Sequence, residues 1–193
     1  MPDSPLPSDR ISIHPTPIAG VMEVEFWPLS DHRGDFRRIY AVESFARTGL
    51  FPDGPVHVNL ARTTRAGTVR GLHWQKTPGE RFGESKLVLC IAGRVYDVAV
   101  DLREGSPTRH QHHALELSAE GNRGLLIPPG VAHGMQALQD DSALIYFHSA
   151  PFQPELECGA RVDDPILNIR WPLPIENLSE RDLTHPLLRE ETT

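Results

Sequence analysis

The chain has 193 residues, a net charge of -7 and a mean hydropathy of -0.34. The acidic balance argues against a nucleic-acid partner, because binding to a phosphate backbone needs a surplus of Lys and Arg. Apolar runs stay well short of the ~20 residues of a membrane span, and residues 1–10 have no apolar core of a signal peptide. Cys90 and Cys158 have no CxxC spacing, so we expect reduced thiols in a cytoplasmic protein with no membrane partner.

Eighteen prolines and fifteen glycines divide the chain into short runs. Five of the prolines fall in the first seventeen residues, so we expect residues 1–20 to form an extended N-terminal arm. Beyond it the runs alternate or are rich in β-branched residues, which predicts strands. Strands are expected over residues 21–27, 36–42, 55–63, 68–75, 86–92, 95–102, 113–117, 125–127 with its continuation 132–138, and 143–149. A short helix is expected over 43–48, ended by Gly49.

About nine short strands with turns between them are typical of a jelly roll or β-barrel. From residue 151 the chain becomes irregular and rich in proline, with a few helical turns near its end. A length of 193 residues suits one domain. We therefore expect a single all-β domain, with a barrel over residues 21–150 and an irregular, partly helical C-terminal segment over 151–193.

The strand Val69–Gln75 carries a possible base and a possible anion ligand three residues apart. Side chains alternate across a strand, so we expect Arg70 on one face and His73 on the other, together with Gly71 and Gln75. Gly71 would leave room for a ligand beside His73. A single strand histidine is more often structural than catalytic, so the rest of the chain must decide between the two.

A second histidine, His133, follows a Pro-Pro-Gly turn that should aim it across the barrel toward His73. This pattern resembles the second motif of the cupin superfamily, whose members often bind a metal inside the barrel. Lys86 stands where the first cupin motif would supply a glutamate, and an ammonium group repels a divalent cation. We therefore expect no metal at this site, and we expect the histidine-rich stretch 110–113 to be a solvated edge.

Nine motifs follow one another between about residue 21 and residue 188. They are Asp31-x-Arg33-Gly34-x-Phe36, Arg70-Gly71-Leu72-His73-x-Gln75, Lys86-Leu87-Val88, Asp97-Val98-x-Val100-Asp101-Leu102-Arg103, Gly105-Ser106-Pro107-Thr108, Ile127-Pro128-x-Gly130-x-Ala132-His133-Gly134, Asp164-Pro165, Trp171-Pro172 and Leu178-Ser179-x-x-Asp182. In order and spacing the chain resembles the dTDP-4-dehydrorhamnose 3,5-epimerase family. The resemblance implies a cupin-type jelly-roll β-barrel and a cofactor-free, metal-free epimerase of a nucleotide-linked 4-keto-6-deoxy sugar.

The resemblance also implies catalytic roles for four residues. His73 is similar to the family's base, which removes a proton beside the C4 carbonyl, and Asp182 to the acid that orients it. Lys86 would stabilise the developing oxyanion. Tyr146 matches the tyrosine that returns a proton from the opposite face. Without the resemblance, Asp182 could equally cap a helix, Lys86 could be a surface charge and Tyr146 a core residue.

Eight further positions are expected to bind substrate on the same grounds. Arg33 and Arg70 match residues that hold the diphosphate, where the forked guanidinium geometry favours phosphate oxygens. The remaining positions in this set are Phe36, His57, Asn59, Gln75, His133 and Phe152. The resemblance further implies a homodimer paired through β-strands, with the N-terminal arm reaching the partner.

Three positions depart from the family pattern, and all three concern binding. Arg37-Arg38 stands where many members have a glutamate, His57 replaces a glutamine, and Phe152 replaces a tyrosine-bearing pair. These departures leave open another nucleotide sugar, or epimerisation at C3 or C5 alone. The rival hypotheses are a metal-dependent cupin isomerase or oxygenase, and a non-catalytic binder of sugar nucleotides.

Overall fold

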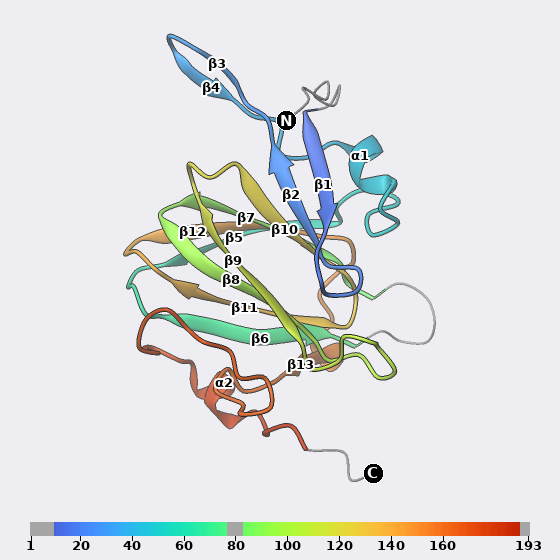
Figure 1. Ribbon diagram of the computed structural model, residues 1–193, viewed down its shortest axis with the longest axis vertical. Coiled ribbons are helices and arrows are strands. Elements are labelled where there is room, and N and C mark those ends of the chain that lie inside the picture. The colour runs from blue at the N-terminus through green and yellow to red at the C-terminus, as the bar shows by residue number, and fades with distance from the viewer. Residues whose placement is uncertain (1–9, 77–82, 190–193) are drawn as a thin grey trace.

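Two antiparallel sheets face each other in the computed structural model, which describes residues 10–76 and 83–189 (Figure 1). The six-stranded sheet contains, in spatial order, β1 (Ile11–Pro15), β2 (Met22–Phe26), β10 (Arg123–Ile127), β7 (Lys86–Ala92), β12 (Ser142–His148) and β5 (His57–Thr63). The five-stranded sheet contains β13 (Glu157–Gly159), β6 (Val69–Gln75), β11 (Val131–Ala137), β8 (Arg94–Asp101) and β9 (His112–Ser118). The expected all-β jelly roll is confirmed.

The helices are short, and one hairpin stands apart from the two large sheets. The helical segments are α1 (Val42–Ala46), η1 (Pro154–Leu156) and α2 (Glu180–Thr184). The hairpin of β3 (Leu29–Asp31) and β4 (Gly34–Phe36) projects away from one end of the molecule (Figure 1). Within residues 10–76 and 83–189, no helix is long and apolar enough to cross a membrane.

Three apolar layers stabilise the sheets, because the strands β6, β7, β8, β10, β11 and β12 have buried residues on both faces. Strand β7 shows how the sequence does this: Leu87 and Leu89 join an outer layer with the helix α1, while Val88 and Cys90 join the layer between the sheets. A third layer lies between the five-stranded sheet and the C-terminal segment. The period-two alternation of β7 therefore also turns Lys86 inward, where the inner layer gives way to a cavity.

The structure corrects three of the expected elements. Residues 11–15 of the expected arm form the edge strand β1, paired with β2, and Ile18 is only 1% exposed. Residues 37–41 form no strand; the half-buried Tyr40 instead stacks on Phe45, with 4.7 Å between the ring centroids. Residues 1–9 of the expected arm lie outside the described residues.

The third correction concerns the Pro-Pro-Gly turn. Residues 132–138 do not continue the strand 125–127, because β10 and β11 belong to different sheets. Gly130 adopts a φ of +77°, which favours glycine, and the two prolines before it cannot donate ladder hydrogen bonds. The turn therefore carries the chain from one sheet to the other and places His133 on the inner face of β11. There His133 is the register partner of His73 in the same sheet, so the expectation that it faces His73 across the barrel is wrong.

Candidate active site

A cavity of about 940 Å³ opens between the two sheets. It is lined by residues of β5, β6, β7, β11 and β12, by the loop between β5 and β6, and by α2 with the segment that leads into it. The sequence-predicted residues that line it are Asn59, Arg70, His73, Lys86, His133, Tyr146 and Asp182. The fold thus brings together all four expected catalytic residues and three of the eight expected binding residues.

Both Arg70 and His73 line this cavity, which corrects the expectation that they lie on opposite faces of their strand. The pairing of β6 with β11 shifts register between His133 and Met135, so strict alternation fails here. Gly71 has a φ of +137°, and a Cβ at this position would lie 2.6 Å from the Cα of Gly134. Gly71 therefore serves the close approach of two strands and does not provide the room for a ligand that the sequence suggested.

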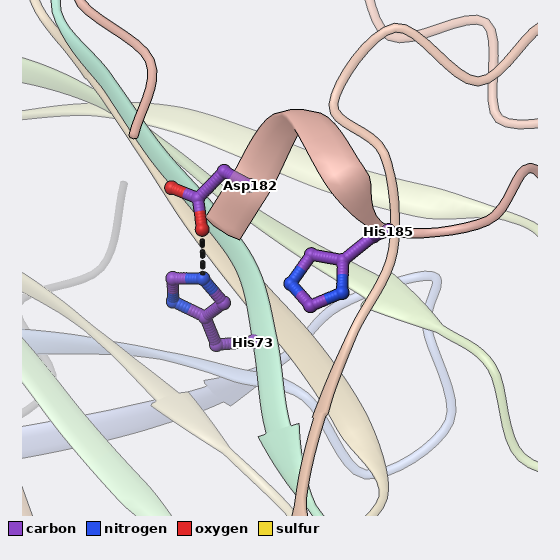
Figure 2. A group of neighbouring side chains, drawn as sticks. All are labelled: His73, Asp182 and His185. Atoms are coloured by element: carbon purple, nitrogen blue, oxygen red, sulfur yellow. Dashed lines mark hydrogen bonds and ion pairs between the residues drawn. The ribbon is translucent and has the colours of Figure 1, made fainter. Parts of the chain in front are cut away.

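His73 and Asp182 form a hydrogen-bonded pair on one wall of the cavity. Nε2 of His73 lies 2.7 Å from Oδ1 of Asp182, whose side chain is 4% exposed. Figure 2 shows the second ring nitrogen of His73 pointing away from Asp182. Ser179 caps α2 by accepting a hydrogen bond from the backbone N–H of Asp182, which fixes the start of the helix. The bond to Asp182 thus orients the imidazole through one ring nitrogen, and the other ring nitrogen can act as a base.

The environment of His73 favours its neutral form. Burial lowers the pKa of His73 below its ordinary value, and the nearby charges of Arg181 and Lys86 lower it further. The hydrogen bond to Asp182 and its negative charge act in the opposite direction but do not compensate fully. A neutral imidazole can accept a proton, so the pair is poised for general base catalysis.

The lowered pKa of His73 predicts how the activity falls on the acid side of the pH profile. Protonated His73 cannot act as base, so kcat/KM should fall as the pH drops through its pKa, with a midpoint below the ordinary histidine value of about 6.5. Asp182→Asn should move the midpoint to still lower pH, because Asp182 raises this pKa. The measurement is kcat/KM from about pH 4.5 to 9 for both proteins, after the range of stable folding has been established. A wild-type midpoint above about 7 would contradict the assignment.

His185 lies beside the pair, and its ligand atom, that of His73 and that of Asp182 lie within 4.8 Å of one another (Figure 2). Such a group could hold a metal ion, which reopens the metal hypothesis at a place that the cupin motifs do not predict. However, Nη2 of Arg181 lies 3.2 Å from Nε2 of His73, and Nε of Arg181 lies 3.7 Å from Oδ1 of Asp182. A guanidinium group at this distance disfavours a cation there, so we interpret the group as a base with its orienting acid.

Tyr146 lies on β12, in the opposite sheet from His73. Its ring is flanked by His133, edge-on at 5.8 Å, and by His148, stacked at 6.0 Å. His133 Nε2 is held at 2.8 Å by the fully buried Asp97. Burial raises the pKa of Tyr146 well above its ordinary range. The phenol therefore stays protonated and can donate its proton.

Positive charge converges on the cavity although the chain is acidic overall. Arg70 lines it together with Arg62 and Arg65, which sequence reasoning missed. Nε of Arg70 donates to Thr63 at 3.1 Å, and its Nη2 donates to the backbone carbonyl of Arg62 at the same distance. These bonds orient one guanidinium group within a cluster of three, an arrangement that suits a diphosphate.

The family model for dTDP-4-dehydrorhamnose 3,5-epimerase matches residues 15–190. The chain belongs to this family. It is 37% identical over 183 residues to the dTDP-4-dehydrorhamnose 3,5-epimerase of Sinorhizobium fredii, covering 94% of this chain and 92% of that one. It is 36% identical to a dTDP-4-dehydrorhamnose 3-epimerase of Streptomyces niveus, covering 92% and 84%. A solved epimerase from Legionella pneumophila, in complex with dTDP-4-keto-L-rhamnose, matches with a TM-score of 0.83 and 34% identity over 92% of each chain.

Family membership makes this protein an isomerase of the nucleotide-sugar epimerase class, as the sequence motifs predicted. Relatives that epimerise C3 and C5 and relatives named for C3 alone have similar identity to it. Overall similarity therefore does not separate the two specificities, and the cavity residues must decide between them.

Five residues that the resemblance assigned to binding do not line the cavity of this epimerase. Gln75 is buried, its Oε1 accepts from the backbone N–H of Gln153 and its Nε2 donates to the carbonyl of Pro151. Gln75 therefore binds the chain that follows β12 and does not reach into the cavity. Phe152 lies between the two residues that Gln75 contacts, and it is 52% exposed. His57 is exposed opposite His148 on the edge strand.

The other two, Arg33 and Phe36, lie on the projecting β3–β4 hairpin. Arg33 is bound to Asp31 at 2.6 Å, and Phe36 is 68% exposed. The spacing of the motifs could not indicate that these two residues lie outside the cavity, because it carries no information about the direction in which a hairpin projects from the sheets. Sequence reasoning also missed Arg181 and His148, which line the cavity; only the proximity of Arg181 to Asp182 in the sequence could have suggested it.

Proposed function

We propose that this epimerase acts on dTDP-4-dehydro-6-deoxyglucose or a closely similar nucleotide-linked 4-keto-6-deoxy sugar, inverting C3, C5 or both without a cofactor. The observation that carries the proposal is a pair of proton-transfer groups from opposite sheets that line one cavity. His73, oriented by Asp182, belongs to one sheet, and Tyr146, kept protonated by burial, belongs to the other. Inversion at carbon needs such a pair, because the proton leaves one face and returns to the other.

The chemistry assigns a step to each group. Protons at C3 and C5 lie next to the C4 carbonyl, so neutral His73 can remove one as negative charge moves to the carbonyl oxygen. Lys86 reaches this side of the cavity, with Nζ 3.5 Å from the backbone carbonyl of His73, and would stabilise the enolate oxygen. Tyr146 then donates its proton to the opposite face of the carbon, and the carbonyl re-forms.

The test is hydrogen exchange in D2O, followed by proton NMR with dTDP-4-dehydro-6-deoxyglucose as substrate. The C3 and C5 signals should disappear with time as deuterium enters the sugar, and epimerised product should form. Loss of one signal alone would name a single-site epimerase. A protein that binds the substrate but exchanges neither proton, across a panel of nucleotide sugars, would overturn the proposal and leave a non-catalytic binder.

We further expect Arg70 to bind the diphosphate. Arg70→Ala should raise KM by about tenfold or more, because charge-assisted bonds to phosphate oxygens are lost, while kcat changes much less. The matched control is Arg94→Ala, which removes an exposed arginine paired with Glu116 outside the cavity. Steady-state kinetics of both variants makes the comparison. Equal KM values in wild type and Arg70→Ala would contradict the role.

The projecting hairpin supports a homodimer. Phe36 and Leu29 are 68% and 51% exposed on it, and Val58 and Leu60 are 52% and 54% exposed on the edge strand β5. Exposed apolar residues on a hairpin and an edge strand favour association. We propose that the hairpin of one protomer packs against the edge of the other and brings Arg33 and Phe36 to the mouth of the partner's cavity.

This assembly predicts that Phe36→Asp weakens the dimer and raises KM together. Sedimentation velocity should show a dimer for the wild type and a shift toward monomer for the variant. Val42→Asp is the control, because it also places a carboxylate at an exposed apolar position (51%), on α1 outside the proposed contact. A monomeric wild-type protein with full activity would contradict the assembly.

The free thiols are consistent with a cytoplasmic enzyme, which we also propose. Cys90 and Cys158 form no disulfide with each other, and burial raises the pKa of Cys90 to about 11. A reducing compartment keeps such thiols intact.

A further inference from the structure

Glu84 is a buried carboxylate that the reaction described above does not use. It precedes β7, and its side chain is 4% exposed. Its two oxygens have different partners: Oε1 lies 2.7 Å from Nδ1 of His148, and Oε2 lies 3.2 Å from Nζ of Lys86. Glu84 therefore contacts both Lys86, the expected ligand of the oxyanion, and His148, which lies on the neighbouring strand β12.

His148 connects this acid to Tyr146. Its ring stacks on Tyr146 with 6.0 Å between centroids and 27° between planes. Its Nε2 lies 3.2 Å from Nδ2 of Asn59, an amide nitrogen that can only donate. The contact with Asn59 is a hydrogen bond in the tautomer that carries the ring proton on Nδ1, and in this tautomer that proton is donated to Glu84. Both nitrogens of His148 are thus occupied, which fixes its ring plane against the phenol.

Glu84 keeps its negative charge in this position. Burial by itself would raise its pKa, but the hydrogen bonds from His148 and Lys86 and the positive charge of Lys86 act in the opposite direction, and the pKa is lowered below its ordinary value. An ionised carboxylate at this site holds the ammonium group of Lys86, which otherwise rotates about four side-chain bonds. A buried charge with two partners has little freedom to move.

We propose that Glu84 and His148 are positioning residues of the epimerase: Glu84 sets the place of the Lys86 ammonium group, and His148 sets the orientation of the Tyr146 ring. This inference rests on the proposed function, because it assigns both residues to act through groups of that reaction. Each of the two residues affects a different half of the reaction. Glu84 governs formation of the enolate through Lys86, whereas His148 governs the return of a proton through Tyr146.

Two variants separate these roles in the D2O experiment. Glu84→Gln preserves shape but cannot accept from both Lys86 and His148. His148→Asn keeps an N–H donor near the position of Nδ1 and so keeps the bond to Glu84, but it removes the ring that stacks on Tyr146. The control is Glu116→Gln, which removes an exposed acid on β9, away from the cavity. Rates are normalised to the concentration of sites that bind dTDP in calorimetry, so that unfolded protein does not count.

Glu84→Gln should lower the rate of deuterium exchange by about 10- to 100-fold with KM changed by less than about twofold, because misplacing a catalytic group by ~1 Å costs that much. His148→Asn should exchange deuterium at nearly the wild-type rate but form about tenfold less epimer per exchange event. An exchange rate of Glu84→Gln within about twofold of wild type, or an unchanged ratio in His148→Asn, overturns the inference. Failure of the proposed function itself looks different, because the wild-type protein then exchanges nothing.

Discussion

His73→Ala should abolish exchange of the substrate protons in D2O, with the rate lowered by about 10²- to 10⁴-fold at both carbons. The reason is the geometry of the pair: one ring nitrogen is held by Asp182 at 2.7 Å, and the other is the free base. Alanine leaves Lys86 and Tyr146 in place, so the oxyanion site survives without a group to remove the proton. The measurement is the decay of the C3 and C5 signals in proton NMR, compared at equal concentrations of dTDP-binding sites.

The control for this result is His14→Ala. His14 lies on β1, and its side chain is 60% exposed and outside the cavity, so its removal should leave exchange unchanged. If His73→Ala still exchanged protons at near the wild-type rate, the base would have to be another group of the cavity. His133, held by Asp97 at 2.8 Å, would then be the next histidine to replace.

Tyr146→Phe is expected to separate exchange from inversion. The base can still remove a proton and return a deuteron from the same face, so exchange should continue. Epimer formation should fall by about 10²-fold, because phenylalanine has no proton to donate to the opposite face. The observable is the ratio of epimerised product to deuterated substrate, followed in the same NMR samples.

Tyr96→Phe is the matched control for that ratio. Tyr96 lies on β8 and packs edge-on against Trp171 at 6.1 Å, in the layer outside the five-stranded sheet. Removing its hydroxyl should leave the ratio of epimer to exchange as in the wild type. A Tyr146→Phe protein that inverts its substrate at the wild-type ratio would show that the second proton comes from elsewhere, for example from water.

The sequence determined the class of fold and the family, and it indicated residues for the site. Period-two alternation in short runs such as 86–92 and 95–102 predicts strands, because each face of a strand must match the layer it contacts. The helix expected over 43–48 occurs at Val42–Ala46. The motifs identified the family, which the comparisons confirm, and the resemblance to that family singled out seven residues that line the cavity.

Only the tertiary structure decided how those residues are combined. His73 and Asp182 are 109 residues apart in the chain, and their contact depends on how the C-terminal segment packs against the five-stranded sheet. Local pattern also failed at β6, where the close approach of Gly71 to Gly134 and a register shift bring Arg70 and His73 to one cavity. It failed again for Arg33 and Phe36, which a hairpin carries away from that cavity. Alternation and propensity are properties of neighbouring residues, whereas a buried acid such as Glu84 acquires its partners from strand pairing and side-chain packing between distant segments.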